Sequence, residues 1–331
     1  MLYLLSSQSK GVKIVEKPII DSFGRKLYYL RLSVTDKCQF SCTYCGIHSR
    51  DFLPQKALLT FEEIKRVLHI FKSMGTKKVR FTGGEPLMNP DIGEMLRYAS
   101  SLGLKTALTT NGFLLRERWE EIEPFIDSVN ISLDSVNPST FAKISSRDQK
   151  DLQKVTDAIE LVVRSGTSVK INTVIVRENA REIDDIIDFS KSLKVPIRFI
   201  EYMNVKGNEK ETPDFEEIQN MLMQKYSLLP MSDKIGDGPA LYYRTPQGMI
   251  MGFISYSSPH FCDGCNKVRI TSDGKLRLCL VLGIELSLRD LLRNDMTDDG
   301  IESAIRAFVM LKPFSHGKVK ILKSRMNSIG G

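Results

Sequence analysis

The chain has 331 residues, with 47 Lys and Arg against 40 Asp and Glu, so its formal net charge is +7. Hydrophobic residues make up 42% and charged residues 26%, which excludes a disordered, collagen-like or small disulfide-rich chain. No apolar run reaches the roughly 18 residues that a membrane-spanning helix needs, and residues 2–5 are too short for a secretory signal. We therefore expect a cytoplasmic protein that does not bind membranes.

From residue 28 to residue 203, short β-type runs alternate with longer stretches of helical period. The predicted strands are residues 28–34, 78–82, 105–109, 128–133, 169–176 and 197–202. The predicted helices are residues 61–74, 91–102, 114–122, 152–165 and 181–193, the first begun by a capping box of Thr60 with Glu63 and ended by Gly75. Strands joined by right-handed helical crossovers predict a parallel sheet, either open and doubly wound or curved into an incomplete barrel.

The pattern changes after residue 203, so we divide the chain into an N-terminal extension (1–27), an α/β region (28–203) and a C-terminal α+β region (204–331). In the last region we predict a helix over 214–225, β-type segments at 242–244 and 249–254, and two short helices near the end. Residues 268–278 are typical of a hairpin that turns at Asp273-Gly274. Such a hairpin would return Cys279 to the neighbourhood of Cys262 and Cys265.

All six cysteines fall into two groups of three, Cys38, Cys42 and Cys45 and then Cys262, Cys265 and Cys279. Disulfides are disfavoured in a long chain without an export signal, so zinc or iron–sulfur clusters are the stronger interpretations. Three thiolates leave one position open, which suits a [4Fe–4S] cluster that binds a reacting molecule. His48 offers a fourth ligand for zinc, and a zinc-stabilised nucleic-acid-binding protein is a rival class that the positive charge suggests.

The first group has the form C-x3-C-x2-C with Tyr44 before its last cysteine, and Gly83-Gly84-Glu85-Pro86 follows the next predicted strand. This combination resembles the radical S-adenosylmethionine (SAM) enzymes. The resemblance implies that the three thiolates hold a [4Fe–4S] cluster whose fourth iron binds SAM. One electron then cleaves SAM and yields a 5′-deoxyadenosyl radical.

Further motifs resemble the GTP 3′,8-cyclase family over nearly the whole chain. They are residues 30–36, 78–87 and 197–203, the second group C-x2-C-x13-C and the Gly-Gly end. The resemblance implies an incomplete (β/α)6 barrel with a C-terminal extension that carries a second [4Fe–4S] cluster, whose open iron binds guanine. It also implies conversion of GTP to (8S)-3′,8-cyclo-7,8-dihydroguanosine 5′-triphosphate, the first step of molybdenum cofactor biosynthesis. The alternative is a radical SAM peptide-modifying enzyme with an auxiliary cluster.

The resemblance also implies the roles of individual residues. It assigns SAM binding to Tyr44, Gly84, Ser132 and Met203. It assigns GTP binding to Arg31, Arg80, Thr109, Lys170, Lys267, Val268 and Arg269, to which we add Lys78 because it shares a strand face with Arg80. Catalytic roles fall to Arg31, Lys267, Arg269, Gly330 and Gly331, although a terminal diglycine also fits a frayed end.

The last two expectations concern a departure from the family pattern at Lys267 and the partners of the protein. Lys267 stands where the family usually has Arg, so a bidentate phosphate contact becomes a point charge. The expected partners are GTP, a low-potential electron donor and a downstream cyclic pyranopterin monophosphate synthase, with a homodimer implied by the resemblance and no nucleic acid.

Overall fold

A computed structural model describes residues 16–45, 52–203, 213–233, 235–258 and 261–317. The described strands form one sheet in the order β12-β11-β10-β1-β2-β3-β4-β5-β6-β9-β8-β7. Six of them, the predicted parallel strands, form its centre: β1 (Tyr29–Ser33), β2 (Lys78–Thr82), β3 (Lys105–Thr110), β4 (Ser128–Ser132), β5 (Ser168–Ile175) and β6 (Ile197–Glu201). The prediction of these strands is confirmed to within one or two residues.

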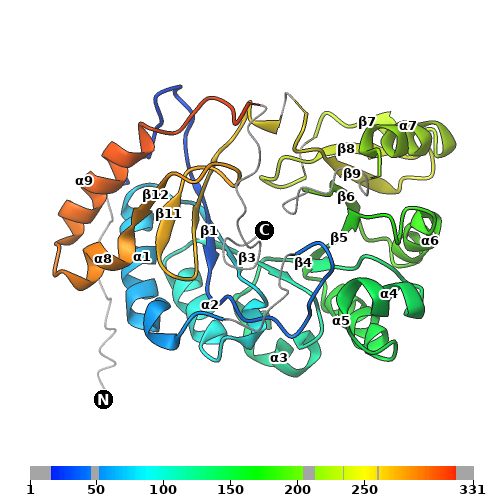
Figure 1. Ribbon diagram of the computed structural model, residues 1–331, viewed down its shortest axis with the longest axis horizontal. Helices are drawn as coiled ribbons and strands as arrows, with labels where there is room; N and C mark the ends of the chain where they lie inside the picture. The colour runs from blue at the N-terminus through cyan, green and yellow to red at the C-terminus, as the bar shows by residue number, and fades with distance from the viewer. Residues whose placement is uncertain (1–15, 46–51, 204–212, 234, 259–260, 318–331) are drawn as a thin grey trace, which may run out of the picture.

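The helices of this region lie on the outer, convex side of the curved sheet (Figure 1). They are α1 (Phe61–Ser73), α2 (Ile92–Ser101), α3 (Leu115–Ile122), α4 (Pro138–Ser145), α5 (Asp151–Ser165) and α6 (Ile183–Ser192). A doubly wound sheet would carry helices on both faces, whereas here the inner face lines a cavity. The strand order ends at β12 and at β7 without closing. The fold is therefore an incomplete barrel.

Local sequence explains how these helices begin and bury one face. At α1 the Thr60 hydroxyl accepts from the Glu63 backbone N–H, and the Glu63 carboxylate accepts from the Thr60 N–H, as the predicted capping box requires. Apolar residues three and four positions apart place one side of α1 in the core, including Ile64, Leu68 and Phe71. Burying each such side chain contributes about 1.5–3 kcal/mol relative to leaving it in water.

The C-terminal region adds strands to both edges of the central sheet. Its β10 (Lys267–Ile270) pairs in parallel with β1, and β11 (Lys275–Arg277) and β12 (Glu285–Ser287) continue that edge antiparallel. The other edge is extended by β9 (Ile250–Ile254), parallel to β6, and then by β8 (Leu241–Arg244) and β7 (Leu229–Pro230). Helices α7 (Phe215–Lys225), α8 (Leu288–Arg293) and α9 (Asp298–Val309) pack at the two sides (Figure 1).

The predicted hairpin is confirmed and sets the position of the second cysteine group. Strands β10 and β11 are joined by a turn in which Gly274 has φ +78°, a backbone conformation that glycine adopts without strain. The turn returns the chain toward Cys262 and Cys265, so that Cys279 lines the same cavity as they do.

Candidate active site

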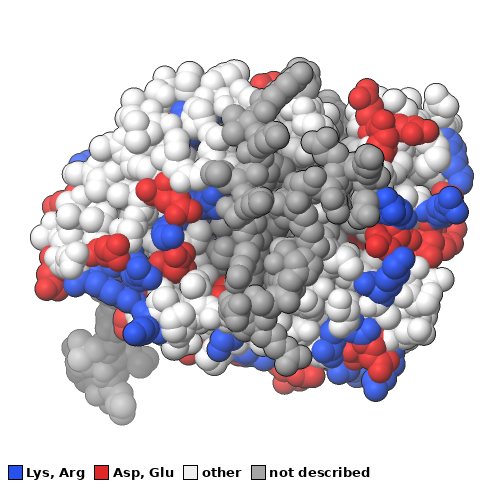
Figure 2. Space-filling view, in the orientation of Figure 1, with Lys and Arg blue, Asp and Glu red and all other residues white. Residues whose placement is uncertain are grey.

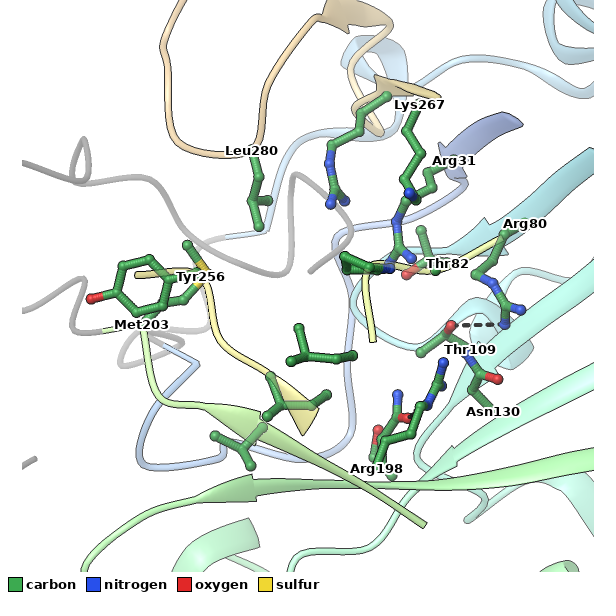
Figure 3. Close-up of a pocket in the computed structure, with 18 of the residues that line it drawn as sticks. Arg31, Arg80, Thr82, Thr109, Asn130, Arg198, Met203, Tyr256, Lys267 and Leu280 are labelled. Atoms are coloured by element: carbon green, nitrogen blue, oxygen red, sulfur yellow. Dashed lines mark hydrogen bonds between the residues drawn. The ribbon is translucent and has the colours of Figure 1, made fainter. Parts of the chain in front are cut away.

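The inner face of the barrel encloses a cavity of about 350 Å³. It is lined by all six cysteines and by most of the predicted site residues, namely Arg31, Tyr44, Lys78, Arg80, Gly84, Thr109, Ser132, Lys170, Met203, Lys267 and Arg269. These residues come from both ends of the sequence. The sheet therefore brings them together as the sequence predicted, and Figure 3 shows several of them around the open space.

The loop that carries the first cysteine group is held against the loop after β2 by backbone hydrogen bonds. The Gly84 N–H donates to the Thr35 carbonyl at 2.8 Å, and the Glu85 N–H donates to the Lys37 carbonyl at 2.8 Å. A Cβ atom at Gly84 would lie 2.3 Å from the Lys37 oxygen, so only glycine allows this approach. The Gly-Gly-Glu-Pro motif thus fixes the start of the cysteine loop.

Glu85 is fully buried and organises the next loop. Its carboxylate accepts from the Thr110 hydroxyl at 2.7 Å, from the Asn111 N–H at 2.8 Å and from the Leu87 N–H at 3.1 Å. Burial raises the pKa of Glu85 to about 7, although these donors oppose the shift. Asn111 in turn points its side-chain amide at the Cys38 sulfur, 3.7 Å away. The carboxyl group therefore positions a contact to a proposed cluster ligand.

Tyr44, Asp134 and β5 form a second fixed element beside the first cysteine group. The Tyr44 hydroxyl donates to the Asp134 carboxylate at 2.6 Å, and the same carboxylate accepts from the Val174 N–H at 2.8 Å. Burial raises the pKa of Asp134 to about 6 and raises that of Tyr44 well above its usual value. Ser132 and Met203 line the cavity on this side, at the ends of β4 and β6.

Cationic side chains line the cavity in two rows that run across the neighbouring strands β10, β1 and β2. In one row Tyr29 lies between Lys267 and Lys78, and in the next Arg31 lies between Arg269 and Arg80. Both lysine ammonium groups lie over the Tyr29 ring, at 5.3 Å for Lys78 and 5.7 Å for Lys267. The period of two along each strand directs these residues inward.

Arg80 is fixed by hydrogen bonds to its neighbours. Its guanidinium donates to the Tyr29 hydroxyl at 2.6 Å and to Thr109 at 3.2 Å, the latter drawn as a dashed line in Figure 3. Burial raises the pKa of Tyr29, but the surrounding cations, Arg80 first, outweigh burial and bring that pKa to about 7.

Burial and mutual repulsion act on the other cations of the cavity. Burial, followed by the nearby charge of Arg269, lowers the pKa of Arg31 to about 9. Burial and neighbouring cations also lower the pKa of Lys170 and of Lys267 to about 8. A site that holds so many cations at this cost is suited to a ligand with several negative charges.

Sequence reasoning missed Asn130, Asn172 and Arg198, which complete this surface. Arg198 donates to the Asn172 side-chain oxygen at 2.9 Å, and its pKa is lowered by burial. Asn130 and Lys170 are register partners on β4 and β5. The alternation of side chains along a strand could have identified them. Arg198 and Ile200 lie on the inward face of β6, and Lys170 and Asn172 lie on the inward face of β5.

Positive charge predominates in the lining of this cavity. Its described lining contains seven Lys and Arg side chains but only two carboxylates, Glu201 and Asp237. On the described part of the outer surface in Figure 2, Lys and Arg are interspersed with Asp and Glu over α4, α6 and α7. Nucleic acid binding requires a continuous basic surface, and the described part of this face does not present one.

The second cysteine group lies beside the cationic rows. The Cys265 N–H donates to the Cys262 carbonyl at 3.1 Å, and Cys279 lines the same cavity. Burial raises the pKa of Cys262, and Cys279 and Cys265 act in the same direction. Burial acts to raise the pKa of Cys265 as well, but Lys312 and other nearby donors outweigh it, so this pKa is lowered. None of the six cysteines forms a disulfide.

The donor sets fit iron–sulfur clusters better than a mononuclear metal. Among the described residues, no three His, Cys, Asp or Glu side chains are arranged to hold one ion. A [4Fe–4S] cluster needs no such convergence, since each thiolate binds a different iron, and soft thiolates are its usual ligands. His48, the alternative zinc ligand, lies outside the described residues.

Four predicted residues need separate comment. The Val268 side chain packs in the core, on the opposite face of β10 from its two basic neighbours, so only its backbone can face a ligand. Lys78 faces the cavity and also forms a 3.0 Å ion pair with Asp237. Gly330 and Gly331 lie outside the described residues.

In the part of the chain that the structure describes, no helix has the length and apolar character needed to cross a membrane.

Comparisons with known proteins agree with this architecture. Residues 32–190 match the family model of the Radical SAM superfamily, and residues 195–318 match that of Molybdenum Cofactor Synthesis C. The chain resembles the solved structure of Streptococcus suis SuiB bound to precursor peptide SuiA, with a TM-score of 0.60 and 18% identity over 85% of this chain and 66% of that one. It also resembles native anSMEcpe with bound AdoMet, with a TM-score of 0.60 and 16% identity over 88% and 82% of the two chains.

The incomplete barrel, with a cysteine triad after its first strand and Gly-Gly-Glu-Pro after its second, defines a radical SAM protein with a C-terminal extension. The chain is 38% identical over 329 residues to the GTP 3′,8-cyclase of Marinobacter nauticus, covering 95% of this chain and 98% of that protein. The chain therefore belongs to the GTP 3′,8-cyclase family.

Proposed function

We propose that this protein is a GTP 3′,8-cyclase, which converts GTP to (8S)-3′,8-cyclo-7,8-dihydroguanosine 5′-triphosphate in molybdenum cofactor biosynthesis. One observation carries the proposal: two cysteine triads and seven cationic side chains line the same cavity. A triphosphate supplies the negative charge that these buried cations need. Two clusters with open positions would serve SAM and guanine separately.

The proposed ligand-binding residues form two groups, one at each end of the cavity. Cys38, Cys42 and Cys45 would hold one [4Fe–4S] cluster, and SAM would lie against Tyr44, Gly84, Ser132 and Met203. When bound, this cluster supplies the electron that cleaves SAM and so starts hydrogen abstraction from C3′ of GTP. At the other end, Cys262, Cys265 and Cys279 would hold the second cluster, next to the guanine.

The cationic rows would fix the triphosphate and, through it, the ribose. Arg31, Arg80 and Arg269 present planar guanidinium groups that suit phosphate oxygens, while Lys170 and Lys267 supply point charges. The Arg80 guanidinium is held by Tyr29 and Thr109 before substrate arrives, so less side-chain freedom is lost on binding. Such fixation holds C3′ and C8 of GTP in a near-attack geometry.

The proposed reaction also requires partners outside this chain. A low-potential donor must deliver electrons, and a cyclic pyranopterin monophosphate synthase must consume the product. We infer the cytoplasm as the site of the reaction and a homodimer as the working form from the family resemblance.

Product analysis tests the proposal. Protein reconstituted anaerobically with iron and sulfide is incubated with dithionite, SAM and either GTP or ATP. We expect 5′-deoxyadenosine and a new nucleotide with the mass of GTP in the GTP reaction alone. Acid-labile sulfide must accompany the iron. Zinc without sulfide, or 5′-deoxyadenosine formed equally well without GTP, would refute the proposed function, and the second result would direct attention to peptide substrates.

A further inference from the structure

Lys312 is a buried cation that neither the motifs nor the proposed reaction uses. It follows α9 by three residues, and only 3% of the residue is exposed. Its ammonium group donates to the Lys267 carbonyl at 3.2 Å and to the Leu278 carbonyl. Burial acts to raise the pKa of Cys265, and the charge of Lys312 is the first of the nearby groups that outweigh it. A chain segment beyond the last helix thus reaches the hairpin that carries the second cysteine group.

The acceptors around Lys312 match the chemistry of an ammonium group. The group has three N–H donors and no acceptor, and two backbone carbonyls accept hydrogen bonds from it here. One carbonyl belongs to Lys267 on β10, two residues after Cys265, and the other to Leu278, directly before Cys279, so the lysine links the two sides of the second triad. A buried charge is stable only when it is paired and hydrogen-bonded, and the cysteine thiolates of a bound cluster would supply the opposite charge.

Arg25 holds the same segment from the other side. Its guanidinium donates to the carbonyls of Pro313 and Phe314, both at 2.7 Å, and to the carbonyl of Cys262 at 3.2 Å. A 2.7 Å ion pair with Asp21 fixes the guanidinium. Arg25 therefore links the two residues after Lys312 to the first cysteine of the second triad.

Phe314 makes a further contact in this arrangement. Its ring packs edge-on against Phe23 with centroids 5.4 Å apart, and the Arg25 guanidinium lies 5.4 Å from the Phe23 centroid and 5.7 Å from that of Phe314. The N-terminal hairpin closed by the Ile20–Lys26 bridge is thereby joined to the C-terminal segment at the cysteine site.

We propose that Lys312 is a positioning residue of the second cluster: its buried ammonium group links the chain on both sides of the second triad, raises the reduction potential of the cluster, and is held in place by Arg25. This inference rests on the proposed function, which assigns a [4Fe–4S] cluster to the second triad. A nearby positive charge favours the more negative, reduced form of a cluster, and hydrogen bonds to ligand sulfur act in the same direction.

Potentiometry of three variants tests the inference in the full-length reconstituted protein. Lys312→Met removes the charge and the donors but keeps the chain length, whereas Lys312→Arg keeps the charge. Arg306→Met is the matched control, because Arg306 joins α9 to the carbonyls of Lys17 and Pro18 without touching a cysteine. The signal of the second cluster is the one that survives when the cysteines of the first triad are replaced by alanine.

We expect Lys312→Met to weaken the electron affinity of the second cluster at least tenfold, which is 59 mV in midpoint potential for a one-electron couple. Lys312→Arg and Arg306→Met should change it less than threefold. Selective loss of the second cluster in Lys312→Met, with unchanged melting of the apoprotein, also supports the inference. An Arg25→Met variant should shift the potential in the same direction by a smaller factor.

Two outcomes separate the possible failures. If Lys312→Met retains both clusters with a potential within threefold of the wild-type value, the role of Lys312 is refuted. If wild-type protein binds only one cluster, the proposed occupant of the second triad is wrong, and the proposed function fails before Lys312 is tested.

Discussion

Arg31 and Arg269 are register partners in the parallel pairing of β1 with β10, although one comes from the start of the barrel and the other from the C-terminal extension. Both guanidinium groups face the cavity, and burial lowers the pKa of each, with Arg269 the next contributor at Arg31. Placing like charges side by side in a buried position opposes folding. The pair is therefore best explained by an anionic ligand that binds both.

Replacing Arg31 should separate binding from stability. In Arg31→Met we expect the Kd for GTP to rise about 10- to 100-fold, because a hydrogen bond to a charged group contributes about 1.5–3 kcal/mol. The GTP-free protein should melt at an equal or higher temperature, since one buried charge has been removed. Calorimetry with and without GTP measures both quantities. Arg116→Met, at an exposed position of α3, is the control and should change neither. If Arg31→Met raises the Kd and also lowers the melting temperature, Arg31 is mainly structural.

Raising the pH should weaken GTP binding. Lys170 and Lys267 have pKa values of about 8, and Tyr29 has one of about 7, so each loses a proton between pH 7 and pH 9. All three changes make the cavity less positive. We expect the Kd for GTP to increase across this range, measured by equilibrium binding in the absence of SAM. An affinity that is constant or rises with pH would contradict the assignment of these residues to the triphosphate.

The same groups predict the opposite trend for the GTP-free protein. A lysine with a pKa of about 8 in the fold and about 10.5 when unfolded is charged in both states below pH 8, where its burial opposes folding. Above pH 8 the unfolded chain binds more protons, so stability rises. Compared with Lys170→Met, the wild-type free energy of unfolding should therefore increase between pH 7 and pH 9. A difference that is independent of pH would refute the shifted pKa of Lys170.

Gly84→Ala should remove the first cluster selectively. The added methyl group would lie 2.3 Å from the Lys37 carbonyl oxygen, which forces the cysteine loop away from its position. We expect about half the iron of the wild-type protein and no SAM cleavage. Gly264→Ala is the matched control, because a Cβ there meets nothing within 4 Å. Full iron content in Gly84→Ala would show that the close approach is not required.

Glu85 should be a major contributor to stability at this end of the barrel. Glu85→Ala leaves the Thr110 hydroxyl and two backbone N–H groups without their acceptor in the core, so we expect the free energy of unfolding to fall by about 2–4 kcal/mol. Urea denaturation of the apoprotein measures this loss. Glu85→Gln keeps one acceptor oxygen and should lose less. Equal stability of wild type and Glu85→Ala would contradict the role we give to these hydrogen bonds.

Local patterns predicted most elements of the fold but not how the extension joins the barrel. The β-type run at residues 249–254 was predicted, whereas its parallel pairing with β6 was not, because strand pairing over such sequence distances is decided by packing of the whole chain. Helix α4 was also missed. Its signal was present, since Asn137 caps the helix and Pro138 occupies its first position, but the helix is too short for a clear apolar period.

The site residues that could be predicted are those that belong to a short motif or place a charge within an apolar strand. Gly84 and the cysteines belong to short motifs, and Arg31 and Arg80 are conspicuous charges inside apolar strands. Arg198 lies within the motif at residues 197–203 but was assigned no role, because its importance depends on its position beside Lys170 and Asn172 of the neighbouring strand β5. Lys312 gives no signal of its own in the sequence. Its contacts with the Lys267 and Leu278 carbonyls exist only after the segment that follows α9 has reached the hairpin.

The transfer of deuterium from GTP to SAM tests the central claim most directly. Reconstituted protein, dithionite and SAM are incubated anaerobically with GTP deuterated at C3′, and the 5′-deoxyadenosine is analysed by mass spectrometry. We predict one deuterium atom in this product, dependent on GTP and absent with unlabelled GTP. 5′-Deoxyadenosine that forms with deuterated GTP but carries no deuterium would contradict hydrogen abstraction from C3′ and with it the assigned reaction.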